Sequence, residues 1–305
     1  MQHIHTTRIL SFFSFFLLAC TAFGQRTQWT PDGNAYWLAE KKGITQTDFA
    51  TKRQTIVATA EQLTPKGATT PLPIKAFKPS DDGKKMLIFT NSQRVWRYET
   101  RGDYWVLDLA VGKLRQLGAS LPGASLMFAK ISPDGNLAAY VSRHNLYLED
   151  LVSGKITQLT KDGTDKMING TFDWAYEEEF DCRDGFCWSP DSKSIAYWQI
   201  DARDVKYFLM MNNTDSTYSF TVPVEYPKVG ESPSACRVGV INLKKKKTRW
   251  MDVPGDARQH YIPRMAWAAN STDIILQQLD RKQQKSVVFT CNAATGAATD
   301  RKSVV

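Results

Sequence analysis

The chain repeats one pattern, a turn of Ser, Pro, Asp and Gly followed by a strand in which apolar and polar residues alternate. Four clear copies are "WTPDGNAYWLAE", "FKPSDDGKKMLIFT", "ISPDGNLAAYVS" and "WSPDSKSIAYWQI", and a degraded copy, "WAANSTDIILQQL", begins at Trp267. In such turns Pro presets φ, Asp or Ser bonds the local backbone, and Gly supplies a positive φ. Because alternation with a period of two indicates half-buried strands, the pattern predicts an all-β fold.

The spacing of the copies indicates which all-β fold this is. They begin about 50 residues apart early in the chain and further apart later, which is the spacing of four-stranded propeller blades. A blade cannot bury its faces without neighbours, yet we count only about five blade starts. The last blade breaks off at "CNAATGAATDRKSVV". We therefore expect an incomplete β-propeller over residues 25–305 and an incomplete gene.

The N-terminus has the features of an export signal. A short basic lead precedes the apolar run "ILSFFSFFLLA", which is too short to span a bilayer and has the length of a signal-peptide core. Two processing sites compete. "LLAC" resembles a lipobox, which would make Cys20 a lipidated N-terminus, whereas "AFG" before Gln25 resembles an ordinary signal-peptidase site and would end a signal peptide at residue 24. Both predict an exported protein, either periplasmic or anchored to the outer membrane as a lipoprotein.

The distribution of charge and the spacing of the cysteines argue against a nucleic-acid-binding protein and against a zinc protein. The net charge of +8 is scattered, and the one dense cluster, Lys244 to Lys247, reads as a solvated hairpin tip, so we expect no nucleic-acid binding. No Cys or His residues lie at the spacing of a zinc site, and we expect neither a metal nor a cofactor. Cys182 and Cys187 are close in sequence, and an exported protein permits either a disulfide or two thiols there.

The segment "DWAYEEEF" departs from the strand pattern. Neighbouring residues on a strand face opposite ways, so a strand could not aim Glu178 and Glu179 at one ligand. The segment lacks alternation and Asp173 suits an N-cap, which together predict a short helical insertion. Clustered carboxylates raise one another's pKa unless a cation intervenes, and the ammonium group of a substrate would be such a cation. Trp174 and Tyr176 are expected to be packing residues.

A family resemblance rests on this segment and its surroundings. "FDWAYEEEF", then "WSPDSKSIAYWQID" and "VPVEYPKVGESPS", resembles the propeller domain of the dipeptidyl peptidase IV branch of the prolyl oligopeptidase clan, and "IFTNSQRVWRYETRGDYWVLDL" is similar to an earlier blade of it. The resemblance implies about five of eight blades here, followed by an α/β-hydrolase domain. It also implies that Glu178 and Glu179 bind the α-amino group of a peptide and that Arg97 helps to hold the peptide's backbone carbonyl.

The sequence carries no catalytic residues for such a reaction. The α/β-hydrolase signature G-x-S-x-G occurs nowhere in the 305 residues, so no catalytic Ser, Asp or His is assigned and the chain alone should be inactive. By resemblance, the whole enzyme would be a serine peptidase that releases Xaa-Pro or Xaa-Ala dipeptides. Its partners would be peptides with a free N-terminus, its own catalytic domain and a second copy of itself. The alternatives are a tripeptide-releasing relative and a non-catalytic periplasmic propeller that binds a protein partner.

Overall fold

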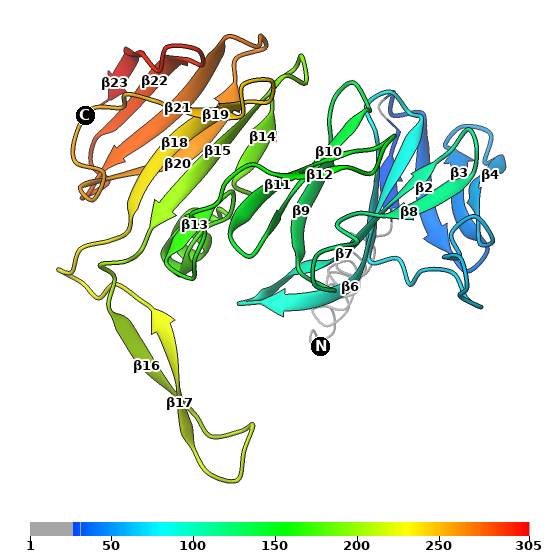
Figure 1. Ribbon diagram of the computed structural model, residues 1–305, viewed down its shortest axis with the longest axis horizontal. Coiled ribbons are helices and arrows are strands. Elements are labelled where there is room, and N and C mark those ends of the chain that lie inside the picture. Colours follow the sequence, from blue (N-terminus) through cyan, green and yellow to red (C-terminus); the bar gives the residue numbers. More distant parts are fainter. Residues whose placement is uncertain (1–26, 31, 305) are drawn as a thin grey trace, which may run out of the picture. The chain divides into compact units, whose positions relative to one another are not determined.

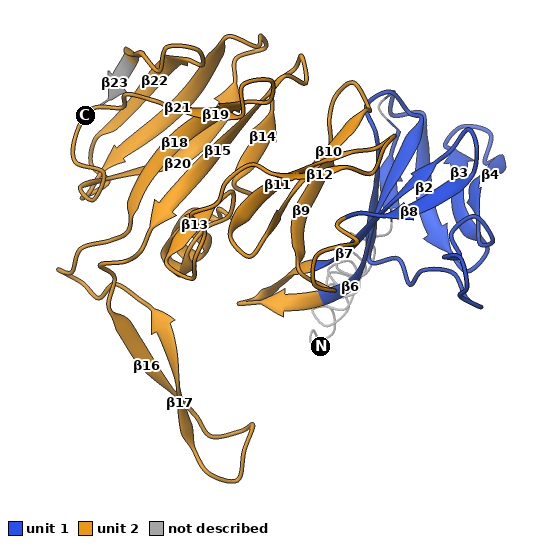
Figure 2. Ribbon diagram, viewed as in Figure 1, with its two compact units in different colours: residues 1–92, 102–117 blue, residues 93–101, 118–305 orange. Residues whose placement is uncertain are grey.

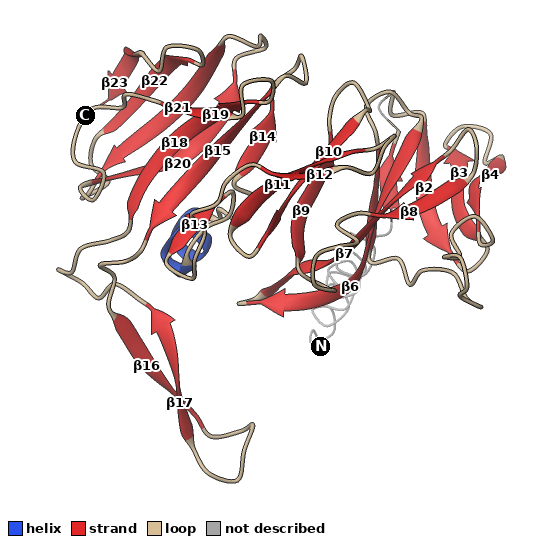
Figure 3. Cartoon of the chain, viewed as in Figure 1, coloured by secondary structure: helices blue, strands red, loops and turns tan. Residues whose placement is uncertain are grey.

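The structure is a computed structural model that describes residues 27–30 and 32–304. The predicted signal peptide, Cys20 and the competing cleavage sites lie outside the described residues. Nearly all regular structure in the described part is β, as predicted, and the helix of residues 174–180 is drawn in blue among the strands in Figure 3. No helix within residues 27–30 and 32–304 has the length and apolar character needed to cross a membrane.

The chain divides into two compact units, coloured separately in Figure 2. The first unit includes an antiparallel sheet with the order β1-β2-β3-β4, formed by β1 (Thr27–Trp29), β2 (Ala35–Glu40), β3 (Gly43–Asp48) and β4 (Gln54–Thr59). A second antiparallel run follows in the chain, formed by β5 (Ala76–Pro79), β6 (Lys85–Val95), β7 (Tyr98–Asp108) and β8 (Lys113–Gln116). Ile44, Phe77 and Ile88 belong to the buried apolar cluster of this unit. The far end of the long β6–β7 hairpin, residues 93–101, belongs to the second unit.

Three more groups of antiparallel strands follow along the chain (Figure 1), of which the first continues the eight-stranded sheet that begins with β5 to β8. One contains β9 (Leu126–Ile131), β10 (Leu137–Ser142), β11 (Asn145–Asp150) and β12 (Ile156–Gln158). The next contains β13 (Met167–Asn169), β14 (Phe186–Trp188), β15 (Ser194–Asp201), β18 (Ala235–Asn242) and β19 (Lys247–Trp250). The last contains β20 (His260–Trp267), β21 (Asp273–Asp280), β22 (Ser286–Asn292) and β23 (Ala298–Val304). Counting β13 and β14 as one interrupted strand, the described residues form five successive groups of four strands, which confirms the predicted all-β architecture.

The repeated turns have the predicted chemistry. Ser132 Oγ donates a hydrogen bond to Asp134 Oδ1 (2.6 Å) and accepts one from the backbone N–H at the start of β10. Gly135 follows with a φ of 75°, which favours glycine. The turns at Ser80 and Ser189 repeat the Ser-to-Asp hydrogen bond. The lysine-rich segment likewise forms the tip of the β18–β19 hairpin, as expected.

The core of the second unit lies between neighbouring blades. One buried cluster joins β10 and β11 to the β15 sheet, through Val141, Leu146 and Tyr197 among others. A larger cluster joins the β15 sheet to the β20–β22 sheet, with Trp198 Nε1 donating to the backbone oxygen of Ile262 (2.8 Å). In the second unit, the facing sides of these adjacent sheets thus cover one another, as the fold requires.

One blade has an interrupted innermost strand. β13 and β14 both pair antiparallel with β15, β13 near Asp201 and β14 near Ile195. Between them the chain leaves the sheet and forms helix α2 (Trp174–Phe180). The predicted helical insertion is therefore real, and it lies within a strand position of the blade.

Candidate functional site

Helix α2 begins at a buried carboxylate. Asp173 is the N-cap, and its Oδ1 accepts a hydrogen bond from the backbone N–H of Tyr176 (3.0 Å), as predicted. Ser234 Oγ donates to the second carboxylate oxygen of Asp173. Burial raises the pKa of Asp173, and these two hydrogen bonds oppose that effect. The helix ends at Asp181, whose φ of 57° is the left-handed conformation typical of a helix C-terminus.

The aromatic residues of the motif fix the helix to the blades. Tyr176 is fully buried, and its hydroxyl accepts the backbone N–H of Ile262 (3.2 Å) from the neighbouring sheet. The ring of Trp174 packs on that of Tyr226, with ring centroids 4.4 Å apart. Tyr176 is thus the packing residue expected from the sequence, whereas Trp174 also contributes to the wall of a cavity.

The three consecutive glutamates lie in three environments, because each helical residue is rotated by about 100° from the last. Glu177 is buried, the side chain of Glu178 is 14% exposed, and Glu179 is exposed. Arg97 Nε lies 2.9 Å from Glu178 Oε1 and 2.7 Å from Oε2. The structure therefore brings together two of the three predicted substrate-binding residues. Glu179 is their neighbour on the helix, and its carboxylate faces solvent.

Arg97 lies at the turn of the β6–β7 hairpin. Trp96, which precedes it, has a φ of 51°, and this left-handed residue reverses the chain between the two strands. The side chain of Arg97 is 72% exposed although it is paired with Glu178. An exposed ion pair of this kind contributes little to stability and exchanges easily for another partner.

A second arginine, which the sequence did not single out, contacts the same helix. Arg183 follows α2, and its guanidinium lies over the ring of Tyr98 with 3.7 Å to the centroid. Its Nε lies 3.5 Å from Glu177 Oε1, and its NH1 lies 2.6 Å from Asp181 Oδ1. Burial raises the pKa of Glu177 to about 7, and the nearby Arg183 opposes that rise.

These groups border a cavity of about 750 Å³ within the second unit. Its wall includes Trp96, Arg101, Arg143, Trp174, Glu177 and Arg183. Two buried polar atoms without a hydrogen-bond partner also belong to lining residues: His144 Nδ1 and Thr171 Oγ1. Aromatic walls with unfilled donors and acceptors suit a ligand that has both polar and apolar parts, such as a peptide.

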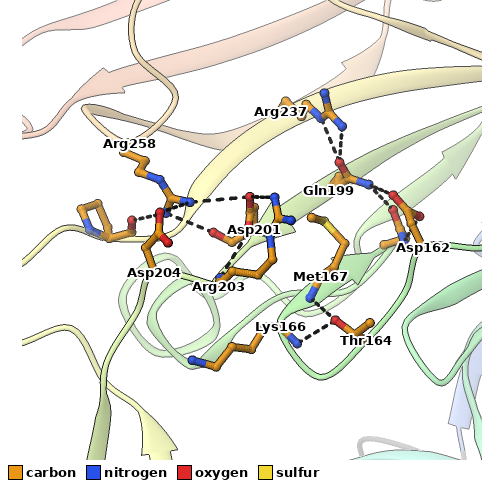
Figure 4. A network of polar contacts seen from close by, with 12 residues as sticks. Asp162, Thr164, Lys166, Met167, Gln199, Asp201, Arg203, Asp204, Arg237 and Arg258 are labelled. Atoms are coloured by element: carbon orange, nitrogen blue, oxygen red, sulfur yellow. Dashed lines mark hydrogen bonds and ion pairs between the residues drawn. The ribbon is translucent and has the colours of Figure 1, made fainter.

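A polar network supports the strands that frame the insertion (Figure 4). Gln199 on β15 donates to Asp162 Oδ2 (2.8 Å) and accepts two hydrogen bonds from the guanidinium of Arg237 (2.8 and 2.6 Å). The same glutamine amide donates to Asn169 on β13 (2.8 Å). This network ties β13, where the chain enters the insertion, to the middle of the blade.

The cysteines near the helix are thiols in the structure. Cys182 is buried and its Sγ donates to the backbone oxygen of Pro263 (3.3 Å), while Cys187 is half-buried. Of the two alternatives left open by the sequence, the structure thus has two thiols and not a disulfide. Burial raises the pKa of Cys187 to about 11. Within the described residues, no cluster of His, Cys, Asp or Glu side chains could hold a metal ion.

Comparison with known proteins gives one consistent match. The family model "Dipeptidyl peptidase IV (DPP IV) N-terminal region" matches residues 80–303. A probable dipeptidyl-aminopeptidase B of Phaeosphaeria nodorum is 26% identical over 242 residues, which are 74% of this chain and 27% of the relative. One from Podospora anserina is 29% identical over 236 residues, which are 72% of this chain and 25% of the relative. The chain thus spans about a quarter of the length of these relatives.

The fold also matches a solved structure. The crystal structure of Porphyromonas gingivalis dipeptidyl peptidase 4 superposes with a TM-score of 0.84 at 23% sequence identity. The match covers 99% of this chain and 42% of that one. Such a likeness supports the propeller architecture.

Proposed function

Because the chain belongs to the family of dipeptidyl peptidase IV N-terminal regions, we propose that it is the substrate-anchoring propeller of an exported serine exopeptidase. The enzyme would release N-terminal dipeptides, with Pro or Ala as the second residue. The observation that carries the proposal is the ion pair between Arg97 and Glu178, beside the exposed carboxylate of Glu179. It brings an acidic pair and a basic group together at the edge of a cavity lined by their neighbours.

The arrangement suits a peptide N-terminus. The ammonium group would take the place of Arg97 at Glu178 and bond to Glu179 as well, through charge-assisted hydrogen bonds. Arg97, which is largely exposed, would then be free to donate to the first carbonyl oxygens of the peptide. Since two extended residues span about 7 Å, an amine fixed at this point would place the second peptide bond at a set distance. The propeller would thereby determine which bond is cut.

The chemistry itself would come from a catalytic domain outside the 305 residues. These residues hold no G-x-S-x-G elbow, and a serine peptidase also needs a general base and an oxyanion hole. We expect the chain alone to leave Gly-Pro and Ala-Pro chromogenic substrates intact. Inhibitor-sensitive turnover by the purified chain would contradict this division of roles.

A kinetic experiment on the full-length protein tests whether Glu178 and Glu179 bind the ammonium group of the substrate. Replacing Glu178 and Glu179 together by alanine should lower kcat/KM for Ala-Pro substrates about 100-fold or more, because both acceptors of the ammonium group are lost. The matched control is Glu231→Ala, which removes an exposed glutamate paired with Lys206 far along the chain. Unchanged kinetics in the double variant would refute the proposed role of Glu178 and Glu179 in binding the substrate's N-terminus.

The products and the substrate's N-terminus decide between the remaining alternatives. Mass spectrometry of a digested peptide should show dipeptides, whereas tripeptides would favour the tripeptide-releasing relative. Acetylating the peptide's N-terminus removes the charge that the glutamates would bind and should abolish cleavage. Cleavage of neither peptide would favour a non-catalytic propeller that binds a protein partner.

The protein's second proposed partner is another copy of itself. The β16 (Tyr207–Asn212) and β17 (Phe220–Glu225) hairpin extends away from β15 and β18 in Figure 1. Its large apolar side chains are exposed, including Phe208, Leu209, Met210, Met211 and Phe220. An isolated two-stranded hairpin is marginally stable in water, and so large an apolar surface is typical of an interface. We propose that this hairpin contributes to a homodimer of the full-length enzyme.

A further inference from the structure

Arg183 contacts both elements that carry the proposed anchor residues. Its guanidinium lies over the ring of Tyr98, and Tyr98 directly follows Arg97 in the hairpin. Its other contacts are with Glu177 and Asp181. Glu177 directly precedes Glu178, and Asp181 caps the C-terminus of the same helix. One side chain thus joins the hairpin of Arg97 to the helix of Glu178.

The contacts of Arg183 with Tyr98 and Glu177 are expected to be more stable than the ion pair between Arg97 and Glu178. The Arg97–Glu178 pair has one largely exposed member, with Arg97 72% exposed, so water and salt weaken it. The side chain of Arg183 is 21% exposed and that of Glu177 is 6% exposed, although the other partner of Arg183, Asp181, is 77% exposed. A stacked, partly desolvated guanidinium with carboxylates at its edge keeps more of its interaction energy. When a substrate ammonium displaces Arg97 from Glu178, the Arg183 contacts remain.

We infer that Arg183 is a positioning residue, which holds the hairpin 93–101 against helix α2 so that Arg97 stays within reach of the substrate bound at Glu178. This inference rests on the proposed function. It assigns Arg183 no contact with the reacting atoms. It predicts that losing Arg183 impairs substrate binding through Arg97 and spares the chemical step.

The test compares two arginines that are stacked in the same way. Arg237 lies 3.7 Å from the ring centroid of Trp250, as Arg183 does from Tyr98, but contacts Gln199 and not the helix. In the full-length protein, Arg183→Met should raise KM for Ala-Pro substrates about tenfold or more with little change in kcat. Arg183→Lys keeps the charge but loses the planar stacking on Tyr98, so its KM should lie between those of the wild type and Arg183→Met. Arg237→Met removes a stacked guanidinium but leaves the contacts of Arg183 with Tyr98 and Glu177 in place, so it is the control for hydrogen exchange of residues 93–101.

A double-variant cycle separates positioning from general damage. If Arg183 acts through Arg97, Arg183→Met should add little to the KM of an Arg97→Met protein, so the two effects are strongly non-additive. Hydrogen exchange gives a readout without turnover. Amides of residues 93–101 should exchange faster in Arg183→Met than in Arg237→Met, because the hairpin is released.

The outcomes distinguish this inference from the function it rests on. If the Glu178 and Glu179 variants lose activity while Arg183→Met matches the wild type in KM and in the exchange of residues 93–101, the inference is overturned and the proposed function stands. Additive effects of Arg97→Met and Arg183→Met would also overturn it. If the wild-type protein cleaves no peptide, the proposed function fails, and the assigned role of Arg183 fails with it.

Discussion

Replacing Glu177 by glutamine should stabilise the protein above neutral pH. Glu177 is 5% exposed, and burial raises its pKa from 4.5 to about 7. At about 1.36 kcal/mol per pH unit, this difference corresponds to about 3 kcal/mol. Because the folded state holds the proton more tightly than the unfolded chain, the contribution of Glu177 to stability falls as pH rises from 4.5 to about 7.

Glutamine has nearly the shape of a protonated glutamate and does not ionise. At about pH 5 the variant and the wild type should therefore be similarly stable, and at about pH 8 the variant should be more stable by up to about 3 kcal/mol. Arg183 would lose one partner but keep Asp181. Glu225, whose pKa burial also raises to about 7, is present in both proteins and cancels in the difference.

The assay is urea denaturation followed by tryptophan fluorescence across this pH range. Glu179→Gln is the matched control, since it makes the same change two residues further along the helix at an exposed position. Its effect should be small, because the side chain is exposed. A difference between Glu177→Gln and wild type that stays constant from about pH 5 to about pH 8, or that favours the wild type at high pH, would refute the reasoning.

Three further predictions concern packing, thiols and assembly. Gly185→Ala should lower the free energy of unfolding by about 1–3 kcal/mol in urea denaturation, because the added Cβ would lie 2.6 Å from the carbonyl carbon of Gly170; a neutral effect would contradict the close approach. Cys187, half-buried and with a raised pKa, should resist iodoacetamide in the native protein, and peptide mapping without reduction should find it unlinked; rapid labelling or a linked peptide would contradict this. Leu209→Arg should shift the full-length protein from dimer to monomer in light scattering, and an unchanged mass would count against the hairpin interface.

The sequence predicted the elements whose signals are local. Alternation and turn chemistry predicted the blades, and the break in alternation with Asp173 ahead of it predicted the helix. Arg97 pairs with Glu178, which lies 81 residues away in sequence. No local pattern encodes a contact of that separation.

The rest of the site depends on tertiary packing. The three glutamates are identical letters in a row, and only the orientation of the helix decides that Glu177 is buried while Glu179 is exposed. Arg183 stands between two acidic residues in "DCRDGFC", which reads as ordinary surface charge. The positioning role inferred for Arg183 depends on its contact with Tyr98, which lies on a hairpin far earlier in the chain. The division of one strand into β13 and β14 could not be predicted from the sequence either, because each part is only three residues long and shows no clear alternation.

That split strand has a consequence for how such a protein can change over evolution. β13 and β14 each take their register from β15 and not from one another. Residues added or removed between them would lengthen or shorten the excursion without shifting either pairing. The blade can thus stay intact while the insertion changes in length, so the surface presented by the insertion and the integrity of the blade are free to be selected separately.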